Sequence, residues 1–129
     1  MSSRGLADTS LFIARESGRP LDADSLPDEI AVSVITIGEL RAGVLAAPDI
    51  TARDRRLVTL QAALTLEPIP VDEDVAAAWA LLRVELRDLG RRMPLNDSWI
   101  AATALAHGLA VVTQDDDYDD VPRLEVVKV

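Results

Sequence analysis

The stretch Leu109-Ala-Val-Val-Thr-Gln-Asp-Asp-Asp-Tyr-Asp-Asp120 passes from an apolar run to five aspartates within six residues. The apolar part predicts a buried strand at residues 109–113. Like charges packed this closely repel one another. The aspartates therefore either lie in a solvated loop, where water and salt screen them, or surround a cation. The place of this loop in the fold decides between these alternatives.

The hydrophobic pattern around this stretch predicts a chain of alternating strands and helices. Short strands separated by helices are typical of an α/β layer structure with a mainly parallel central sheet. Hydrophobic residues make up 49% of the chain but only four residues are aromatic, which favours helices on a buried sheet over a β-sandwich. Strands are expected at residues 5–8, 29–35, 109–113 and 124–129, a brief extended piece at 66–71, and helices at 10–17, 36–47, 51–64, 73–89 and 98–107.

Three carboxylates from distant parts of the sequence are expected at one edge of this sheet. Asp8 follows the first strand, and Asp115 follows the strand at residues 109–113. Ligands bind beyond the carboxyl ends of the strands in open sheets of this kind. Asp97 stands at the start of the helix that leads into that later strand, and helix N-termini face the same edge. The sequence therefore predicts that Asp8, Asp97 and Asp115 lie together.

Glu39 and Asp97 each have an ordinary structural explanation as well. Thr36 and Glu39 have the spacing of a capping box, in which Glu39 accepts a hydrogen bond from the Thr36 amide. The functional alternative places Glu39 in the first helical turn, at the acidic edge. Asn96 or Asp97 would cap the next helix. If Asn96 is the cap, Asp97 lies in the first turn and is free to point elsewhere.

Asp8 is harder to explain as a purely structural residue. It lies between apolar segments that are bound for the core, and a carboxylate buried there needs a partner. Only Arg4 and Arg15 are basic residues near it in the sequence. In the aspartate loop, Asp115 and Asp117 have a spacing that lets a bent loop aim both carboxylates one way.

The outer part of the aspartate loop is better explained by solvation. Asp119 and Asp120 are expected in a solvated turn. An EF-hand is excluded, because the loop lacks a glycine at its sixth position and a glutamate at its twelfth. The expected cation site is therefore confined to the inner part of the loop.

Several carboxylates at one edge, in a chain without cysteine, predict a metal site built from oxygen ligands. Mg²⁺ or Mn²⁺ suits such a set, and Zn²⁺ does not. Such an ion activates water and neutralises the charge that develops when a phosphodiester is hydrolysed. A net charge of −9 disfavours a protein that simply coats nucleic acid. Arginines that could guide a nucleic-acid backbone, although a solvated helix face explains each one more simply, are Arg53, Arg55, Arg56, Arg83, Arg87, Arg91 and Arg92.

Length and composition predict a single domain, residues 1–129, in the cytoplasm. The length is within the usual range for one domain. The absence of cysteine favours an intracellular protein. The N-terminal residues lack the pattern of a secretory signal, and no apolar run approaches the length of a membrane span. We therefore expect no membrane association.

Four motifs in order resemble those of VapC-type toxins of the PIN-domain ribonuclease family. The resemblance covers essentially the whole chain and implies a three-layer α/β/α PIN-like fold. It also implies Mg²⁺-dependent endoribonuclease activity, with Mn²⁺ able to substitute, and a homodimeric toxin paired with a VapB-type antitoxin in a type II toxin–antitoxin system. The motifs are Leu6-Ala-Asp-Thr-Ser10, Val34-Ile-Thr-Ile-Gly-Glu-Leu40, Asn96-Asp-Ser-Trp-Ile-Ala-Ala-Thr-Ala104 and Val111-Val-Thr-Gln-Asp-Asp-Asp-Tyr118.

The resemblance also implies roles for particular residues. The primary metal ligands would be Asp8 and Asp97, with Asp115 or Asp117 acting directly or through water. Glu39 would position or deprotonate the attacking water. Candidates for indirect support or backbone contact are Thr9 and Asn96.

The aspartate loop departs from the family pattern at two positions. Asp116 stands where many relatives have a non-acidic residue, which leaves the fourth ligand open between Asp115 and Asp117. Tyr118 stands where phenylalanine is common, a difference expected to change little.

Two other functions are compatible with an acidic edge. A phosphatase with an aspartyl nucleophile would need a second aspartate two residues after Asp8, where Ser10 stands. The alternative that stays open is a catalytically inactive PIN-like domain that binds other proteins. Loss of Mg²⁺ or Mn²⁺ binding on Asp8→Asn would distinguish a metal site from a merely solvated acidic surface.

Overall fold

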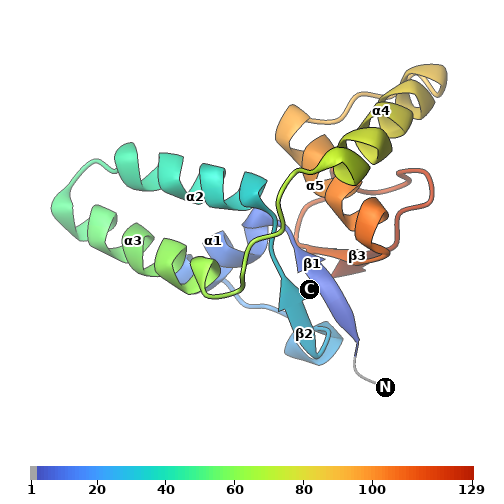
Figure 1. Cartoon of the computed structure of the whole chain (residues 1–129). Coiled ribbons are helices and arrows are strands. Elements are labelled where there is room, and N and C mark those ends of the chain that lie inside the picture. The colour runs from blue at the N-terminus through green and yellow to red at the C-terminus, as the bar shows by residue number, and fades with distance from the viewer. Residues whose placement is uncertain (1–2) are drawn as a thin grey trace.

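Four parallel strands form a central sheet in the computed structural model, which describes residues 3–129 (Figure 1). They are β1 (Arg4–Ala7), β2 (Glu29–Ala31), β3 (Ala110–Thr113) and β4 (Val126–Lys128). Their order across the sheet is β2–β1–β3–β4, and every neighbouring pair is parallel. Because β1 and β3 are neighbours, Asp8 and the aspartate loop leave the sheet at the same edge, as expected.

Helices cover both faces of this sheet. They are α1 (Thr9–Ser17), α2 (Val34–Leu45), α3 (Ile50–Leu64), α4 (Glu73–Asp88) and α5 (Leu95–His107), with a 3₁₀ turn η1 (Ala23–Ser25). Successive strand residues point to opposite faces. Leu6 and Val111 pack in the cluster that contains residues of α4 and α5, whereas Ala7 and Val112 pack with Leu11 of α1. The three-layer α/β/α arrangement is confirmed.

The α2–α3 hairpin extends from the sheet as an arm (Figure 1). It has a small core of its own, in which Leu40 and Val44 pack against Leu60 and Ala63. Phe12 of α1 packs against the same cluster and joins the arm to the sheet layer. The arm therefore places the first turns of α2 next to the edge where β1 ends.

The expected start of α2 is wrong, and so is the capping box. The second strand ends at Ala31, and the helix begins at Val34 rather than Thr36. Ser33 is the N-cap, and its hydroxyl accepts hydrogen bonds from the Ile35 and Thr36 amides at 3.2 and 3.4 Å. A buried serine cap thus converts a β-branched run into helix, overriding its strand propensity. As a result Glu39 lies in the second turn of α2.

The expected caps of α5 are wrong as well. The helix begins at Leu95 and Pro94 is the N-cap residue, without a side-chain capping bond. The Ser98 amide donates to the Pro94 carbonyl at 3.0 Å, so the helix includes three residues that the sequence pattern left out. Asn96 and Asp97 therefore lie inside the first turn, and Asp97 is free of a capping role.

Most other element boundaries agree with the pattern. Asp72 caps α4 through its bond from the Val75 amide at 3.0 Å, and Gly108 ends α5 at φ 64°, which glycine adopts without strain. The last strand is shorter than expected, and the piece at residues 66–71 forms only a bridge between Ser33 and Ile69. Within residues 3–129, no helix combines the length and apolar character needed to cross a membrane.

Candidate active site

Asp8 is buried where β1 ends and α1 begins, with only 2% of its surface exposed. Its Oδ2 accepts a capping bond from the Ser10 amide at 3.4 Å and a shorter one from the Thr113 hydroxyl at 2.9 Å. Its Oδ1 accepts a bond from the Tyr118 hydroxyl at 2.8 Å. Within residues 3–129, Asp8 has no ion pair with a basic side chain. Neutral donors thus satisfy a buried carboxylate whose charge has no basic partner.

A pair of hydroxyl groups fixes the aspartate loop against Asp8. Thr113 donates its hydroxyl hydrogen to Asp8, so its oxygen accepts from the Ser10 hydroxyl at 3.2 Å and from the Asp115 amide at 2.9 Å. The Ser10 oxygen in turn accepts from the Gln114 amide at 3.1 Å. These bonds direct the chain as it leaves β3 and bring the Asp115 carboxylate beside that of Asp8.

Asp97 faces this group from the first turn of α5. The hydroxyl of the fully buried Tyr118 lies 3.2 Å from Asp97 Oδ1 as well as 2.8 Å from Asp8 Oδ1, so it bridges the two carboxylates. Burial, together with the charges of Asp8 and Asp117, raises the pKa of Asp97 to about 7, while the bond from Tyr118 opposes that shift. Burial and the charges of Asp8 and Asp97 raise the pKa of Tyr118, which therefore remains a donor.

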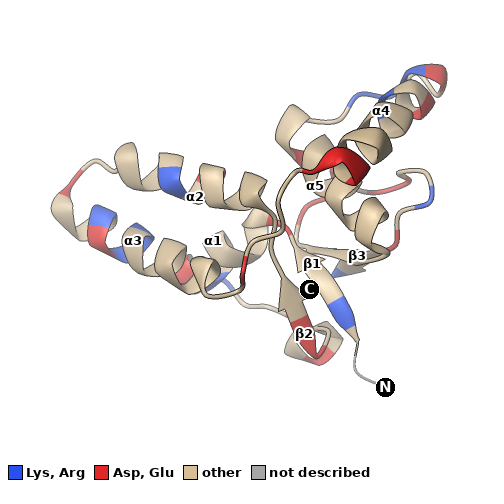
Figure 2. Cartoon of the chain, viewed as in Figure 1, with Lys and Arg blue, Asp and Glu red and all other residues tan. Residues whose placement is uncertain are grey.

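The inner aspartates of the loop complete the acidic group. Partial burial and the neighbouring Asp8 and Asp117 raise the pKa of Asp115, and Arg19 opposes this effect. The Asp117 carboxylate is within hydrogen-bonding reach of Asp97. The structure thus brings Asp8, Asp97, Asp115 and Asp117 together, at the loop that follows β3 in Figure 2.

The outer aspartates of the loop lie apart from this group. Lys128 of β4 forms ion pairs with Asp116 and, at 3.2 Å, with Asp119. The ammonium group of Lys128 lowers the pKa of Asp116. Asp119 is exposed but paired, which adds an ion pair to the expected solvated turn, and Asp120 is exposed.

Glu39 is tied to the acidic group through Thr9. The Thr9 hydroxyl donates to Glu39 Oε1 at 2.7 Å, so its oxygen accepts from the Thr36 hydroxyl at 3.0 Å. Thr9 follows Asp8 directly in the chain, and this short chain of bonds links α1 to α2. Within residues 3–129 this is the one hydrogen bond of the Glu39 side chain, so Oε2 remains available to another donor.

A groove of about 480 Å³ runs beside Glu39. The first turns of α2 form one wall, and Asn96 of α5 contributes to the other. Asn96 precedes Asp97, so the groove adjoins the acidic group. An extended polar chain in this groove would meet Glu39 and Asn96 together.

The sequence matches the model of one protein family. A family model of the PIN domain matches residues 6–124. The chain belongs to the PIN-domain family. The expected resemblance to VapC-type members is confirmed by full-length similarity to proteins of Mycobacterium tuberculosis. Ribonuclease VapC5 is 48% identical, with 97% of this chain and 95% of the relative covered, and ribonuclease VapC4 is 53% identical, with 98% and 97% covered.

A solved structure supports this assignment to the PIN-domain family. The crystal structure of VapBC-5, a member of the VapBC family of toxin–antitoxin systems from Mycobacterium tuberculosis, matches with a TM-score of 0.90 at 45% identity. The match covers 98% of this chain and 99% of the other. Fold and sequence therefore agree over the same residues.

The chemistry of this PIN-domain site fits a divalent cation. Its donors are carboxylate and hydroxyl oxygens, and Arg19 is the basic side chain that lowers the pKa of Asp115. Among residues 3–129, no group of three acidic or histidine side chains lies close enough together to hold one ion. Mg²⁺ retains several waters and is commonly bound through one or two carboxylates. The arrangement therefore fits an ion held by two carboxylates and water.

Three motif residues to which the resemblance assigned no role hold this PIN-domain site in shape. Ser10 and Thr113 orient the loop, and Tyr118 bridges Asp8 and Asp97. The expectation that tyrosine in place of phenylalanine changes little overlooked its hydroxyl. A hydroxyl next to five aspartates was the available signal, since a buried tyrosine needs an acceptor.

Proposed function

We propose that this protein is a Mg²⁺-dependent endoribonuclease, a single PIN domain that acts as the toxin of a VapBC-type toxin–antitoxin pair. The observation that carries the proposal is the buried Asp8, held by neutral donors and surrounded by Asp97, Asp115 and Asp117. Such a group gains a favourable partner when a divalent cation binds. The relatives named as ribonucleases support RNA as the substrate.

The acidic residues divide the work according to their positions. Asp8 and Asp97 would hold the ion directly, and Asp115 or Asp117 would hold it directly or through water. A bound ion would supply a Lewis acid that activates water and offsets the negative charge developing on the phosphate. Mn²⁺ is expected to substitute because it accepts the same oxygen ligands.

Glu39 acts on the attacking water. Thr9 holds Oε1, so Oε2 accepts a hydrogen bond and then the proton from the water. The water oxygen bonds to phosphorus, the bond from phosphorus to the leaving ribose oxygen breaks, and solvent protonates that oxygen. Asn96, across the groove from Glu39, contacts the RNA backbone and keeps the phosphate in line.

The test is cleavage of a mixed RNA pool by the purified protein, free of antitoxin, with Mg²⁺ and with EDTA. Metal-dependent cleavage by the wild type, absent in Asp8→Asn and Asp97→Asn, would support the proposal. Cleavage that persists in both variants, or in EDTA, would refute it. No cleavage even with Mn²⁺ and cellular RNA would favour the inactive PIN-like binding domain.

A VapB-type antitoxin and a second copy of the chain are the expected partners, and action on cellular RNA places the protein in the cytoplasm. Solved VapBC complexes resemble this chain, and the arm exposes apolar side chains that a partner would cover. A basic antitoxin segment would complement the acidic site. Exposed Leu81 of α4 and Leu89 at its C-terminal cap suit the homodimer, which light scattering would detect. The most exposed apolar residues of the arm are Leu45, Ile50 and Val58.

A further inference from the structure

A pocket of about 790 Å³ lies between the second half of α4 and the start of α5, and arginines dominate its wall. Four of the nine residues that line it are arginines and none is acidic, in a chain with 22 acidic and 13 basic residues. Figure 2 shows the basic positions at the end of α4 and in the segment that follows. The four are Arg83, Arg87, Arg91 and Arg92.

These arginines are poorly neutralised by the rest of the described chain. Arg87 pairs only with its exposed neighbour Asp88, at 3.4 Å. Arg91 donates from Nη2 to the Asp119 carbonyl at 2.7 Å, and its buried Nη1 has no hydrogen-bond partner within residues 3–129. Neither Arg83 nor Arg92 forms an ion pair with a described residue. The pocket wall therefore presents guanidinium groups that lack anionic partners.

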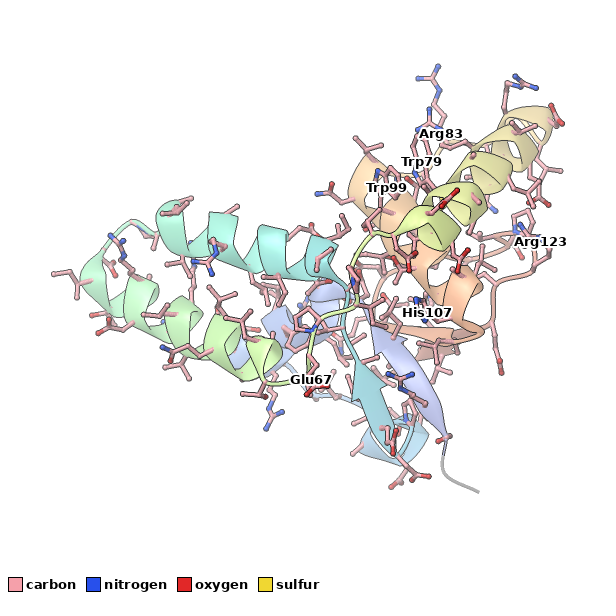
Figure 3. The ribbon with its side chains drawn as sticks, in the orientation of Figure 1. Glu67, Trp79, Arg83, Trp99, His107 and Arg123 are labelled. Atoms are coloured by element: carbon pink, nitrogen blue, oxygen red, sulfur yellow. The ribbon has the colours of Figure 1, made fainter. Side chains whose placement is uncertain are left out.

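A stack of aromatic rings fixes one of these arginines. Trp79 and Trp99 stack with their ring centroids 4.3 Å apart and their planes 3° from parallel. The Arg83 guanidinium lies over Trp79, 5.0 Å from the ring centroid, and Figure 3 shows the three side chains between α4 and α5. The Trp79 indole also donates to the Ser98 hydroxyl at 3.0 Å. A guanidinium held in this way loses little further entropy when it binds an anion.

The pocket shares two elements with the acidic group. Ser98 lines the pocket and directly follows Asp97 in α5. Arg91 donates to the carbonyl of Asp119, in the loop that also carries Asp115 and Asp117. The pocket and the acidic group therefore lie on the same helix and are joined by the same loop.

We propose that this pocket binds phosphates of the RNA backbone to one side of the bond that is cleaved. The proposal rests on the proposed ribonuclease function and adds the surface that holds its substrate. A protein with a net charge of −9 repels RNA at long range, so productive binding needs a local positive surface beside the metal site. Arginine suits this role because its guanidinium group pairs with two phosphate oxygens at once.

The experiment compares two double variants that change the net charge equally. Arg87→Gln/Arg92→Gln alters exposed arginines of the pocket, whereas Arg4→Gln/Arg15→Gln alters exposed arginines of β1 and α1, outside the pocket. The affinity for a labelled single-stranded RNA is measured by fluorescence anisotropy in EDTA over a range of KCl concentrations. Melting curves establish that both variants are folded, and light scattering gives their oligomeric state.

The pocket variant is expected to bind RNA about tenfold more weakly at moderate salt. The slope of log affinity against log salt should fall by about 0.7 for each lost phosphate contact. The control variant should keep the slope of the wild type. Equal changes in both variants would show a mere net-charge effect and overturn the proposal. A change in oligomeric state or in binding of an acidic protein segment, with the RNA slope unchanged, would also overturn it.

Cleavage in Mg²⁺ separates this proposal from the proposed function. If the wild type cleaves RNA and the pocket variant has a raised KM with kcat nearly unchanged, both proposals stand. If the wild type cleaves and the pocket variant has the same KM, only the pocket proposal fails. If the wild type does not cleave, the ribonuclease function fails first, and the proposal that rests on it falls with it.

Discussion

The aspartate loop contains two kinds of carboxylate within a few residues. The inner pair, Asp115 and Asp117, interacts with Asp8 and Asp97 from other parts of the fold. Of the outer aspartates, Asp116 and Asp119 face Lys128. Partial burial and like charges raise the pKa of the inner Asp115, whereas a basic partner lowers the pKa of the outer Asp116.

This difference teaches that residue type and spacing do not assign a function to an aspartate. What lies opposite each side chain does so. The loop bends so that its inner residues meet carboxylates and its outer residues meet an ammonium group. A metal cation is expected only where carboxylates face each other, because Asp116 and Asp119 are already paired with the Lys128 ammonium group.

The largest expected effect comes from neutralising the inner aspartates, with the outer Asp116 as the comparison. Asp117→Asn and Asp115→Asn should each lower kcat, and the one that is the metal ligand should do so by roughly a thousandfold, since a bound ion contributes several kcal/mol to such a transition state. Asp116→Asn should stay within about twofold of the wild type. The rate at which each variant cleaves one defined RNA in Mg²⁺ gives these kcat values. Equal losses in all three variants would abolish the distinction between inner and outer aspartates.

Tyr118→Phe tests whether the tyrosine supports the inner group. The change removes only the hydroxyl that bridges Asp8 and Asp97 and leaves the buried ring. Groups that orient metal ligands typically contribute about 10- to 100-fold in metal affinity. We therefore expect Mn²⁺ to bind at least about tenfold more weakly, as measured by calorimetry. Unchanged affinity would mean that the hydroxyl only satisfies two buried acceptors.

A pH series on the metal-free protein tests the electrostatics of the inner group. The folded-state pKa of Asp97 is about 7, above its ordinary value of 3.8, so this residue binds its proton more tightly when folded. Its contribution to stability is therefore fully present below pH 3.8 and is lost as the pH rises to about 7. The Asp97→Asn variant has no titrating group at this position, so it does not lose this stability as the pH rises. The melting temperature of the variant in EDTA should rise relative to the wild type between pH 5 and 7, then level off.

Two outcomes bear on the interpretation of that series. Mg²⁺ should narrow the difference in melting temperature between Asp97→Asn and the wild type, because the ion offsets the repulsion between carboxylates in the wild type at high pH. A difference that stays constant from pH 5 to 8 would show that the neighbouring acids do not perturb Asp97. The inner and outer aspartates would then have similar electrostatic surroundings.

The arrangement of the inner group could be predicted from sequence because it follows from topology. Asp8 and Asp115 come after neighbouring parallel strands, and their shared edge requires no detail of packing. The N-caps of α2 and α5 could not be predicted in the same way. Ser33 caps α2 because its buried hydroxyl accepts hydrogen bonds from two backbone amides. The β-branched run around it predicts a strand instead.

The contacts that orient the ligands were also beyond sequence patterns, although Thr9 was expected to be a supporting residue. Tyr118 contacts Asp8 and Asp97 over separations of 110 and 21 residues, and Thr9 reaches Glu39 over 30. Such bonds depend on how the layers pack, which local propensity does not encode. The motifs therefore locate the acids, but the hydroxyl groups that orient them emerge only in the folded chain.

The smallest expected effect comes from Lys128→Gln, which removes the partner of the outer aspartates. Asp116 is 91% exposed at its side chain and Lys128 is 40% exposed, so the ion pair is well screened by water. We expect little change in unfolding free energy, measured by urea titration, and cleavage close to that of the wild type. A tenfold loss of kcat with normal stability would contradict this. It would mean that the ion pairs to β4 hold the inner aspartates in position, so that the two halves of the loop act as one unit.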